Sequence, residues 1–497
     1  MAEDQDKVGK EAKEMTNRRE FIKGTAWMGA VALASGCQLN RYGFDDGGAM
    51  QDYALKPMSR IRVGFVGIGS RGTGAVHRVS MLPGVEIVAL CDKKPECVAQ
   101  NLAWLRENKY QAVPKSYVGE ESYKELCDFG ECDVVYCATP WSLHQPVALR
   151  ALHGGKIALV EVTSALTTDE CWELVEASEK YRIPCMQLEN CCYGEMELLG
   201  LHLAKLGMLG EIVHGEGAYI HDLRNVCRTG DKNGEWEWRY GENMKHKGNR
   251  YPTHGLLPVM QAMDVNRGDC FDYLVSLESK QANCERYRRY AMAADDPRKK
   301  DPVMAMGDMN TTLIKTKLGK SIMVQHDVSS PRPYTRINLL SGTKGVWWGM
   351  PWRTYGDDPT VFKVGFEKEI GKGVHEFMKN DEAEALRQKY AHPLWKSVGK
   401  IAQEVGGHGG MDFIMDLRWA YCLQNGLPLD MDVYDLAASS CLCELTERSV
   451  RNRSNSIDVP DFTRGGWRSA KPLGIVDVDL SRMKFDRARK DDAALNV

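Results

Sequence analysis

Apolar and polar positions change their rhythm near residue 190 of this chain. Between residues 61 and 188, short β-branched runs alternate with stretches whose apolar residues follow a helical period. This alternation is typical of a doubly wound parallel sheet. It predicts strands over 62–66, 86–91, 134–138, 157–160 and 184–188, and helices over 73–81, 95–108, 146–153 and 168–180. Hydroxyl and carboxylate side chains at 167–170 suit the start of the last helix.

Beyond residue 190, longer strand-like runs replace the alternation. They predict strands over 211–219, 311–317, 321–325 and 336–340, which is typical of a mixed or largely antiparallel open sheet. Residues 224–248, rich in Gly, Asn, Trp and charge, predict a long loop, and 433–450 predict a helix. We therefore expect an α/β protein with one domain over 60–190, an α+β domain over 191–450 and an extended tail over 451–497.

The N-terminus differs from the rest of the chain. Arg18 and Arg19 precede an apolar run, 24–36, that is too short to span a bilayer. The pattern predicts a twin-arginine export signal over 1–36, a spacer over 37–59 and a periplasmic protein. Cys37 follows small residues and is a candidate for lipid attachment, which would anchor the protein to a membrane; the alternative is an ordinary spacer residue.

Composition excludes some classes of function. The formal net charge of −3 gives no reason to expect a nucleic-acid partner and fits a small neutral substrate better. The 16 cysteines are scattered without metal-ligand or disulfide spacing, so we expect buried thiols and no metal site. Free thiols also suit a protein that folds in the cytoplasm before export.

A glycine-rich turn follows the first predicted strand. Gly67, Gly69 and Gly72 have the spacing that lets a strand turn tightly into a helix whose N-terminus binds a pyrophosphate. Asp92 ends the next predicted strand, where a carboxylate would bind ribose hydroxyls and favour NAD over NADP. We interpret residues 60–190 as an NAD-binding domain of Rossmann type; a plain glycine turn with a capping aspartate is the alternative.

Three further loops follow predicted strands. They hold Thr139 to His144, Glu161 to Thr163, and Glu189 to Tyr193. Ligands of open α/β sheets bind beyond the carboxyl ends of the strands, so these loops should converge on the nicotinamide.

These residues carry a family resemblance that covers nearly the whole folded length. The chain resembles the sugar-oxidoreductase superfamily of glucose-fructose oxidoreductase and inositol dehydrogenase. Glu161-Val162-Thr163 stands where those dehydrogenases place Glu-Lys-Pro, and valine cannot exchange a proton as lysine does.

Several separated motifs narrow the resemblance. Trp141 to His144, Glu161-Val162, Leu188 to Tyr193, Tyr219 to Arg224, Tyr251 to Gly255, Pro331 to Tyr334 and Gly407 to Asp412 together resemble glycoside hydrolase family 109. That resemblance implies a retaining, NAD-dependent α-N-acetylgalactosaminidase. It implies oxidation at C3 of the sugar, loss of the C2 proton, elimination at C1, addition of water and return of the hydride, with NAD tightly bound and recycled.

The resemblance also implies which residues form the site. The cofactor set adds Ser70, Arg71, Trp141, Ser142, Leu143, His144, Glu161, Val162 and Asn190 to Gly67, Gly69, Gly72 and Asp92, and the sugar set is Tyr219, Arg239, Tyr251, Pro252, Thr253, His254 and Tyr334. Simpler interpretations remain open: a helix cap for His144, core packing for Trp141 or His254, ordinary strand aromatics for the tyrosines, and a solvated side chain for Arg239.

Catalytic roles follow from side-chain chemistry within that mechanism. Pro252 and Gly255 flank His254 and predict a loop there. We expect His254 to handle the C3 hydroxyl proton, Tyr193 to be the C2 base, and Tyr251 and Glu161 to assist at the leaving oxygen. Two other functions remain open, an exported NAD(P)-dependent sugar dehydrogenase and a non-catalytic sugar-binding protein. The C-terminal sheet is a candidate for homo-oligomer formation.

Overall fold

A computed structural model describes residues 48–224, 237–350, 362–370, 374–473 and 476–479. They belong to one compact unit, residues 46–497. The predicted export signal and Cys37 lie outside the described residues. Within the described part, none of the helices has both the length and the hydropathy needed to cross a membrane.

The N-terminal domain is a six-stranded sheet in the order β3-β2-β1-β4-β5-β6. All of its strand pairs are parallel. The strands are β1 (Ile61–Val66), β2 (Val85–Asp92), β3 (Lys115–Val118), β4 (Val134–Cys137), β5 (Ile157–Val160) and β6 (Cys185–Gln187). The sequence pattern missed only β3, because this edge strand buries a single residue, Tyr117.

Helices connect these strands and keep the sheet buried. They are α3 (Ser70–Val79), α4 (Pro95–Glu107), α5 (Tyr123–Asp128), α6 (His144–His153) and α7 (Thr168–Tyr181). The predicted helix start at 167–170 is confirmed, since Thr167 and Glu170 form a reciprocal capping box. Burial on both faces explains why β4 and β5 consist of continuous apolar runs.

The C-terminal domain holds an eight-stranded sheet in the order β13-β12-β11-β7-β10-β9-β8-β14. Its strands are β7 (Ile212–Ile220), β8 (Phe271–Glu278), β9 (Asn310–Thr316), β10 (Ser321–Asp327), β11 (Leu339–Gly342), β12 (Gly345–Trp348), β13 (Lys363–Phe366) and β14 (Ile457–Asp458). β7 and β10 pair in parallel and the other pairs are antiparallel. The predicted mixed sheet is confirmed.

Helices of the C-terminal domain differ from prediction in three places. They are α8 (Glu195–Lys205), α10 (Glu237–Lys245), α11 (Thr253–Ala262), α12 (Asn283–Tyr290), α13 (Asn380–Tyr390), α14 (Pro393–Val405), α15 (Met411–Asn425), α16 (Val433–Ser440) and α17 (Leu442–Arg451). The expected loop over 224–248 contains α10, the expected loop at His254 is the start of α11, and the expected helix over 433–450 is divided at Cys441.

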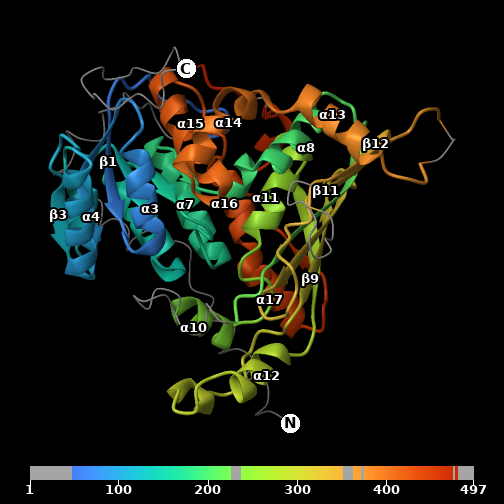
Figure 1. Cartoon of the computed structure of the whole chain (residues 1–497), viewed down its shortest axis with the longest axis horizontal. Coiled ribbons are helices and arrows are strands. Elements are labelled where there is room, and N and C mark those ends of the chain that lie inside the picture. Colours follow the sequence, from blue (N-terminus) through green and yellow to red (C-terminus); the bar gives the residue numbers. More distant parts are fainter. Residues whose placement is uncertain (1–47, 225–236, 351–361, 371–373, 474–475, 480–497) are drawn as a thin grey trace, which may run out of the picture. The chain divides into compact units, whose positions relative to one another are not determined.

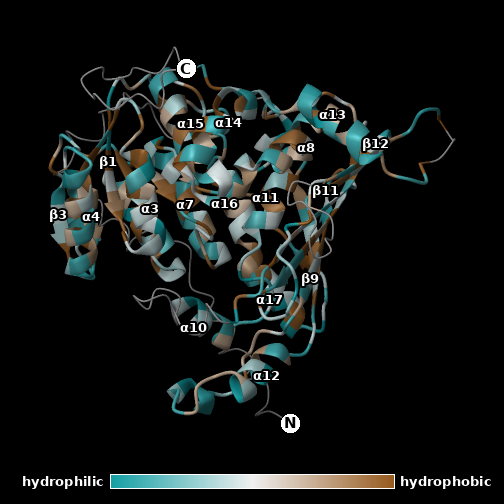
Figure 2. Ribbon diagram, viewed as in Figure 1, coloured by the Kyte–Doolittle hydropathy of each residue, from teal (hydrophilic) through white to brown (hydrophobic). Residues whose placement is uncertain are grey.

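Helix α15 joins the two halves of the protein. It packs against α3 and β1 of the NAD-binding domain and against the 3₁₀ turn Asn190–Tyr193 that follows β6 (Figure 1). Figure 2 contrasts the apolar strand β1 with the largely polar helix α12, none of whose residues is buried. The chain thus returns, some 220 residues after β6, to the carboxyl end of the first sheet.

Candidate active site

The glycine turn is shaped by close backbone contacts. Gly67 has a φ of +80°, and a Cβ there would lie 2.8 Å from the backbone of Ala138. A Cβ at Gly72 would lie 1.9 Å from the carbonyl oxygen of Gly67. Only glycine lets helix α3, capped by Gly69, begin this close to the end of β1.

Asp92 lies beside this turn. Its carboxylate accepts hydrogen bonds from the amides of Ile68 and Lys94, each at 2.9 Å. The glycine cradle, the start of α3 and an acidic group at the end of β2 fit the pyrophosphate and ribose of NAD.

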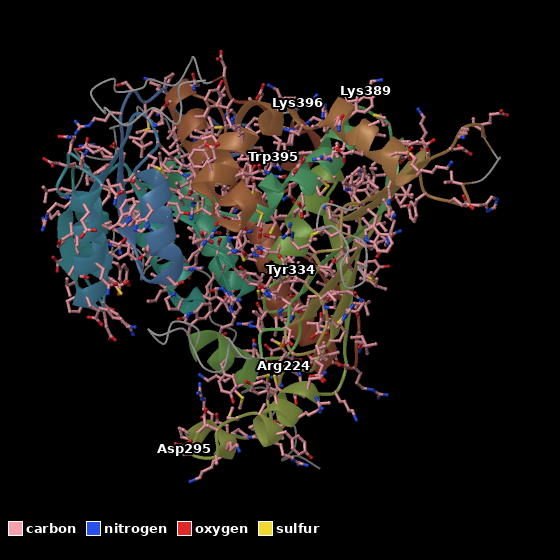
Figure 3. All side chains as sticks on the ribbon, viewed as in Figure 1. Arg224, Asp295, Tyr334, Lys389, Trp395 and Lys396 are labelled. Atoms are coloured by element: carbon pink, nitrogen blue, oxygen red, sulfur yellow. The ribbon has the colours of Figure 1, made fainter. Side chains whose placement is uncertain are left out.

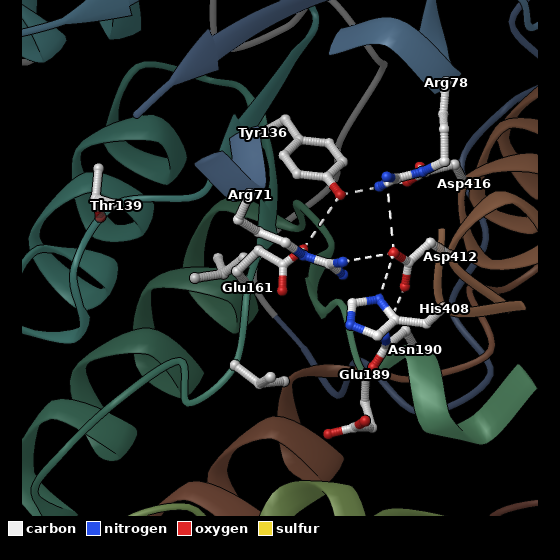
Figure 4. A network of polar contacts seen from close by, with 12 residues as sticks. Arg71, Arg78, Tyr136, Thr139, Glu161, Glu189, Asn190, His408, Asp412 and Asp416 are labelled. Carbon is white, nitrogen blue, oxygen red and sulfur yellow. Dashed lines mark hydrogen bonds and ion pairs between the residues drawn. The ribbon is translucent and has the colours of Figure 1, made fainter. Parts of the chain in front are cut away.

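Arg71 links the cofactor domain to helix α15 (Figure 4). Its Nε lies 2.6 Å from Glu161 Oε1, and its Nη1 lies 2.6 Å from Asp412 Oδ2. Burial alone would lower the pKa of Arg71, yet the charges of Glu161 and Asp412 raise it well above the ordinary value. One turn further along α15, Asp416 accepts from Arg78 Nε at 2.8 Å. The predicted cofactor residues Arg71 and Glu161 therefore form an ion pair inside the site.

His144 and Trp141 brace two strand-end loops. The ring nitrogens of His144 lie 2.7 Å from the carbonyl oxygens of Thr139 and Thr163. Burial lowers the pKa of His144 to about 4. Trp141 Nε1 donates to the carbonyl oxygen of Val162 at 3.1 Å. The loops after β4 and β5, which carry Ser142, Leu143 and Glu161, are thus held together.

A buried carboxylate, Glu189, supports His254. The Nδ1 atom of His254 lies 2.7 Å from Oε1 of Glu189 and 2.9 Å from Oε2. Nε2 of His254 lies 3.3 Å from the Tyr251 hydroxyl. Burial would raise the pKa of Glu189, but His254 and the amide of Cys191 hold it below the ordinary value. Sequence reasoning gave Glu189 no role; its position directly after β6, beside Asn190, was the available signal.

Asn190 connects this pair to a second one (Figure 4). Its side-chain amide donates to Asp412 Oδ1 at 2.5 Å, and Asp412 Oδ2 lies 2.8 Å from Nδ1 of His408. Burial would raise the pKa of Asp412, but Arg71, His408 and Arg78 hold it well below the ordinary value. Adjacent residues at one strand end therefore connect two carboxylate–histidine pairs.

His408 lies in an unusual loop. All five residues from Gly406 to Gly410 have positive φ, and His408 itself has a φ of +47°. A Cβ at Gly407 would lie 2.7 Å from the Cβ of Asp412. The side chain of His408 is 62% exposed, whereas Asp412 is 2% exposed. Burial lowers the pKa of His221, and the charges of Arg239, His254 and His408 add to the lowering.

An aromatic wall completes the site. The ring of Tyr219 lies 4.9 Å from that of Tyr251, 5.3 Å from that of His254 and 6.2 Å from that of Tyr334. Tyr334, labelled in Figure 3, comes from the loop before β11. Pro252 is the N-cap of α11 and Thr253 is its first residue, so His254 lies in its first turn. The predicted sugar-binding residues are thus neighbours, and their rings suit the apolar faces of a sugar.

Arg239 belongs to this wall. It lies on α10 and is 7% exposed, so the solvated alternative is wrong. Its guanidinium lies 4.8 Å from the Tyr251 ring and 5.0 Å from the Trp141 ring. Sequence could not place α10 because its charged residues resemble those of a loop.

The hydroxyl of Tyr193, the predicted C2 base, is held in a buried hydrogen bond. Its hydroxyl donates to Asp430 Oδ2 at 3.0 Å, and Asp430 also pairs with Arg418 at 2.7 Å. Burial raises the pKa of Tyr193 well above the ordinary value, and the charge of Asp430 adds to the rise. The assignment of Tyr193 as the base is therefore wrong. Its hydroxyl already donates a hydrogen bond to Asp430, and the negative charge of Asp430 disfavours the phenolate that a base would need.

The fold and this site define a two-domain protein with an NAD-binding domain of the Rossmann type. Residues 61–187 match the oxidoreductase family, NAD-binding Rossmann fold, and residues 193–469 match the glycosyl hydrolase 109, C-terminal domain. The chain belongs to glycosyl hydrolase family 109.

Curated relatives cover almost the whole chain. A glycosyl hydrolase family 109 protein of Shewanella pealeana is 42% identical over 469 residues, 93% of this chain and 99% of that protein. One of Shewanella putrefaciens is 46% identical over 422 residues, 84% of this chain and 88% of that protein.

Solved structures share the fold at low identity. Levoglucosan dehydrogenase in complex with NADH is 18% identical with a TM-score of 0.59, and the match covers 81% of this chain and 99% of that one. Myo-inositol dehydrogenase from Lactobacillus casei, with NAD(H) and myo-inositol, is 15% identical with a TM-score of 0.51 over 81% of this chain and 99% of that one.

Proposed function

We propose that this chain hydrolyses terminal α-linked N-acetylgalactosamine, or a close sugar, with retention, and keeps its NAD through the reaction. The observation that carries the proposal is the series of contacts His254–Glu189 and Asn190–Asp412–His408. A simple alcohol oxidation needs one group that exchanges a proton, whereas cleavage of a glycosidic bond needs a second. The choice of N-acetylgalactosamine rests on the family resemblance.

NAD would lie on the glycine cradle, with Asp92 at its ribose and Glu161, Val162 and Asn190 near its nicotinamide. When bound, it supplies a hydride acceptor for C3 and returns the hydride at the end of turnover. Arg71, held by Glu161 and Asp412, bridges the cofactor domain and α15 and would slow release of the nucleotide. Such retention suits an enzyme that needs no fresh cofactor in each cycle.

His254 would handle the proton of the C3 hydroxyl. Glu189 accepts a hydrogen bond from Nδ1, which leaves Nε2 as the basic atom of the neutral ring. Nε2 faces the Tyr251 hydroxyl. Burial raises the pKa of Tyr251 well above the ordinary value despite the charge of Arg239, so Tyr251 donates a hydrogen bond there and is no base.

His408 would protonate the leaving oxygen. Asp412 Oδ2 lies 2.8 Å from its Nδ1 and would orient the ring, and its exposed position on the glycine loop leaves the ring accessible to an aglycone. Glu161 lies in an ion pair with Arg71 and would assist by orientation.

A glycoside panel in deuterium oxide tests this proposal. We expect release of the aglycone from α-N-acetylgalactosaminides, deuterium at C2 of the sugar and no accumulation of NADH. Accumulation of NADH equal to the sugar consumed, with no aglycone released, would establish a sugar dehydrogenase instead. Sugar binding with neither reaction would establish a binding protein.

We also propose that the chain is exported in folded form by the twin-arginine route. The cysteines that the structure describes are free thiols, and all but Cys284 are buried, which suits folding in a reducing compartment. Cell fractionation of the wild-type chain and an Arg18→Lys, Arg19→Lys variant tests this, since the variant should stay in the cytoplasm. A fatty-acid label on the wild type but not on Cys37→Ala would establish lipidation.

A further inference from the structure

Three side chains that bind transition metals meet beside the proposed catalytic histidine. One ligand atom each from Glu189, Cys191 and His254 lies within 4.8 Å of the others. Carboxylate, thiolate and imidazole are the three side-chain ligands that zinc accepts in proteins. Sequence reasoning predicted no metal site, because Glu189 and Cys191 lie 63 or more residues from His254 in the chain.

Local structure brings the ligands together. The chain leaves β6 and enters the 3₁₀ turn Asn190–Tyr193, in which the amide of Cys191 donates to Glu189 Oε1 at 3.0 Å. This places the thiol and the carboxylate of two nearby residues on the side of the turn that faces α11, where His254 lies. Glu189 and Cys191 are completely buried, and the His254 side chain is 13% exposed.

Charge around the cluster permits a cation. Glu189 carries a negative charge, and Arg336, whose charge acts on Cys191, forms an ion pair with Glu197 at 2.6 Å. Arg336 Nη1 also donates to the Tyr334 hydroxyl. The charge of Arg336 therefore does not oppose a divalent cation at the Glu189 carboxylate and the Cys191 thiol.

We propose that Glu189, Cys191 and His254 form an inhibitory site for Zn²⁺ or another thiophilic divalent cation. The inhibition rests on the proposed function, because it works by taking Glu189 and His254 out of the proton exchange at C3. The metal bonds to the Glu189 carboxylate, to Nδ1 of His254 and to the Cys191 sulfur. The thiol proton is released to solvent, and the Nδ1 proton of a neutral His254 reappears on Nε2, beside the Tyr251 oxygen. No redox change is involved.

The donor set predicts selectivity. Mg²⁺ requires octahedral oxygen ligands and should not inhibit, whereas Zn²⁺ and Co²⁺ accept the mixed tetrahedral set with water as the fourth ligand.

Spectroscopy of Co²⁺ on the NAD-loaded protein tests binding without reference to activity. We expect a thiolate-to-cobalt charge-transfer band in the wild type and in Cys192→Ala, and its loss in Cys191→Ala and Cys191→Ser. Cys192 is the matched control, because it is a buried neighbour outside the cluster. Cobalt binding without the band in the wild type, or a band that survives in Cys191→Ala, would overturn the site.

Zinc titration of turnover tests the consequence. Cys191→Ala should keep zinc-free activity and raise the half-inhibiting zinc concentration by roughly tenfold or more, since even indirect supports of a ligand are worth about that factor. Cys192→Ala should match the wild type. If zinc inhibits Cys191→Ala at the wild-type concentration, the inhibitory role is refuted. A wild type with the cobalt band but no glycosidase activity would refute the proposed function and leave the metal site in place.

Discussion

The two carboxylate–histidine pairs of the site use the same chemistry in opposite settings. His254 lies in the first turn of helix α11, is 13% exposed and is held by a carboxylate with no exposure at all. His408 lies on a loop of four glycines and is 62% exposed. The difference suits the two roles that we propose, in which His254 acts at a fixed point of the sugar ring and His408 serves a leaving group whose structure changes from substrate to substrate.

Removal of the buried histidine should have the largest effect. His254→Ala should lower kcat by roughly 10²- to 10⁴-fold, the usual range for a positioned acid–base group. NAD should stay bound, because His254 contacts Glu189 and the aromatic wall and not the glycine cradle. Single-turnover kinetics and the NAD content of the purified protein measure both.

His246 offers a matched control. Its Nδ1 lies 2.9 Å from Glu447, so it is also a histidine beside a carboxylate, but it lies outside the site at the end of α10. His246→Ala should retain turnover. Near wild-type activity of His254→Ala would refute the role of the buried pair.

The loss of activity on removal of the exposed histidine should depend on the substrate. His408→Ala should lose about 10²-fold or more on glycosides with poor leaving groups and much less on nitrophenyl glycosides, which need no acid to depart. Aryl glycosides whose phenol leaving groups increase in pKa measure this. In His408→Ala, kcat/KM should fall more steeply with the pKa of the leaving phenol than it does in the wild type. Equal losses across the series would mean that the two histidines share one step.

Asp412 connects the exposed histidine to cofactor retention. Asp412→Asn should speed NAD release roughly 10- to 150-fold, because a charged hydrogen bond to Arg71 of about 1.5–3 kcal/mol is lost. Stopped-flow chase with excess nucleotide measures the rate. Asp416→Asn, one turn along α15 and bonded to Arg78 instead, should release NAD at the wild-type rate. Equal release from both variants would show that α15 acts only as a structural support.

His144, which braces the strand-end loops, should affect the stability of the fold at higher pH than the two carboxylate–histidine pairs do. His144 has a pKa of about 4 in the folded protein against an ordinary value of 6.5. The unfolded chain therefore binds the extra proton first, and stability should fall by about 1.4 kcal/mol per pH unit as pH drops from 6.5 to about 4. The folded protein lowers the pKa of Glu189 and of Asp412 below their ordinary values of 4.5 and 3.8. Their charged forms therefore stabilise the fold at pH values above 4.5 and 3.8, and this stability is lost only as pH drops below those values.

Denaturant unfolding between pH 7 and 3 measures the pH range in which each group changes the free energy of unfolding. His144→Gln should be less stable at pH 7 but lose less on acidification to pH 4, whereas Asp412→Asn should follow the wild-type slope until pH falls near 4. The prediction fails if His144→Gln shows the wild-type slope between pH 6.5 and 4.

Prediction from sequence worked where one local feature imposes one geometry. Apart from β3, the strands of the first sheet follow from hydrophobic period, as do its helices except α5. The cofactor cradle follows from Gly67 and Gly72, which tolerate no Cβ. It failed at β3, which buries one residue, and at α10 and α11, where Gly, Pro and charge suggested loops. Tyr193 was misassigned because its chain position says nothing of where its hydroxyl points.

By itself, then, the sequence determined the two-domain order, the parallel sheet and the glycine cradle, since short-range sterics and periodic burial decide these. Only the tertiary structure decided which polar groups meet. Glu189 is 65 residues from His254 and Asn190 is 222 residues from Asp412, and the packing of α11 and α15 against one turn after β6 brings each pair into hydrogen-bond distance. Such contacts depend on long-range packing, which no local pattern encodes.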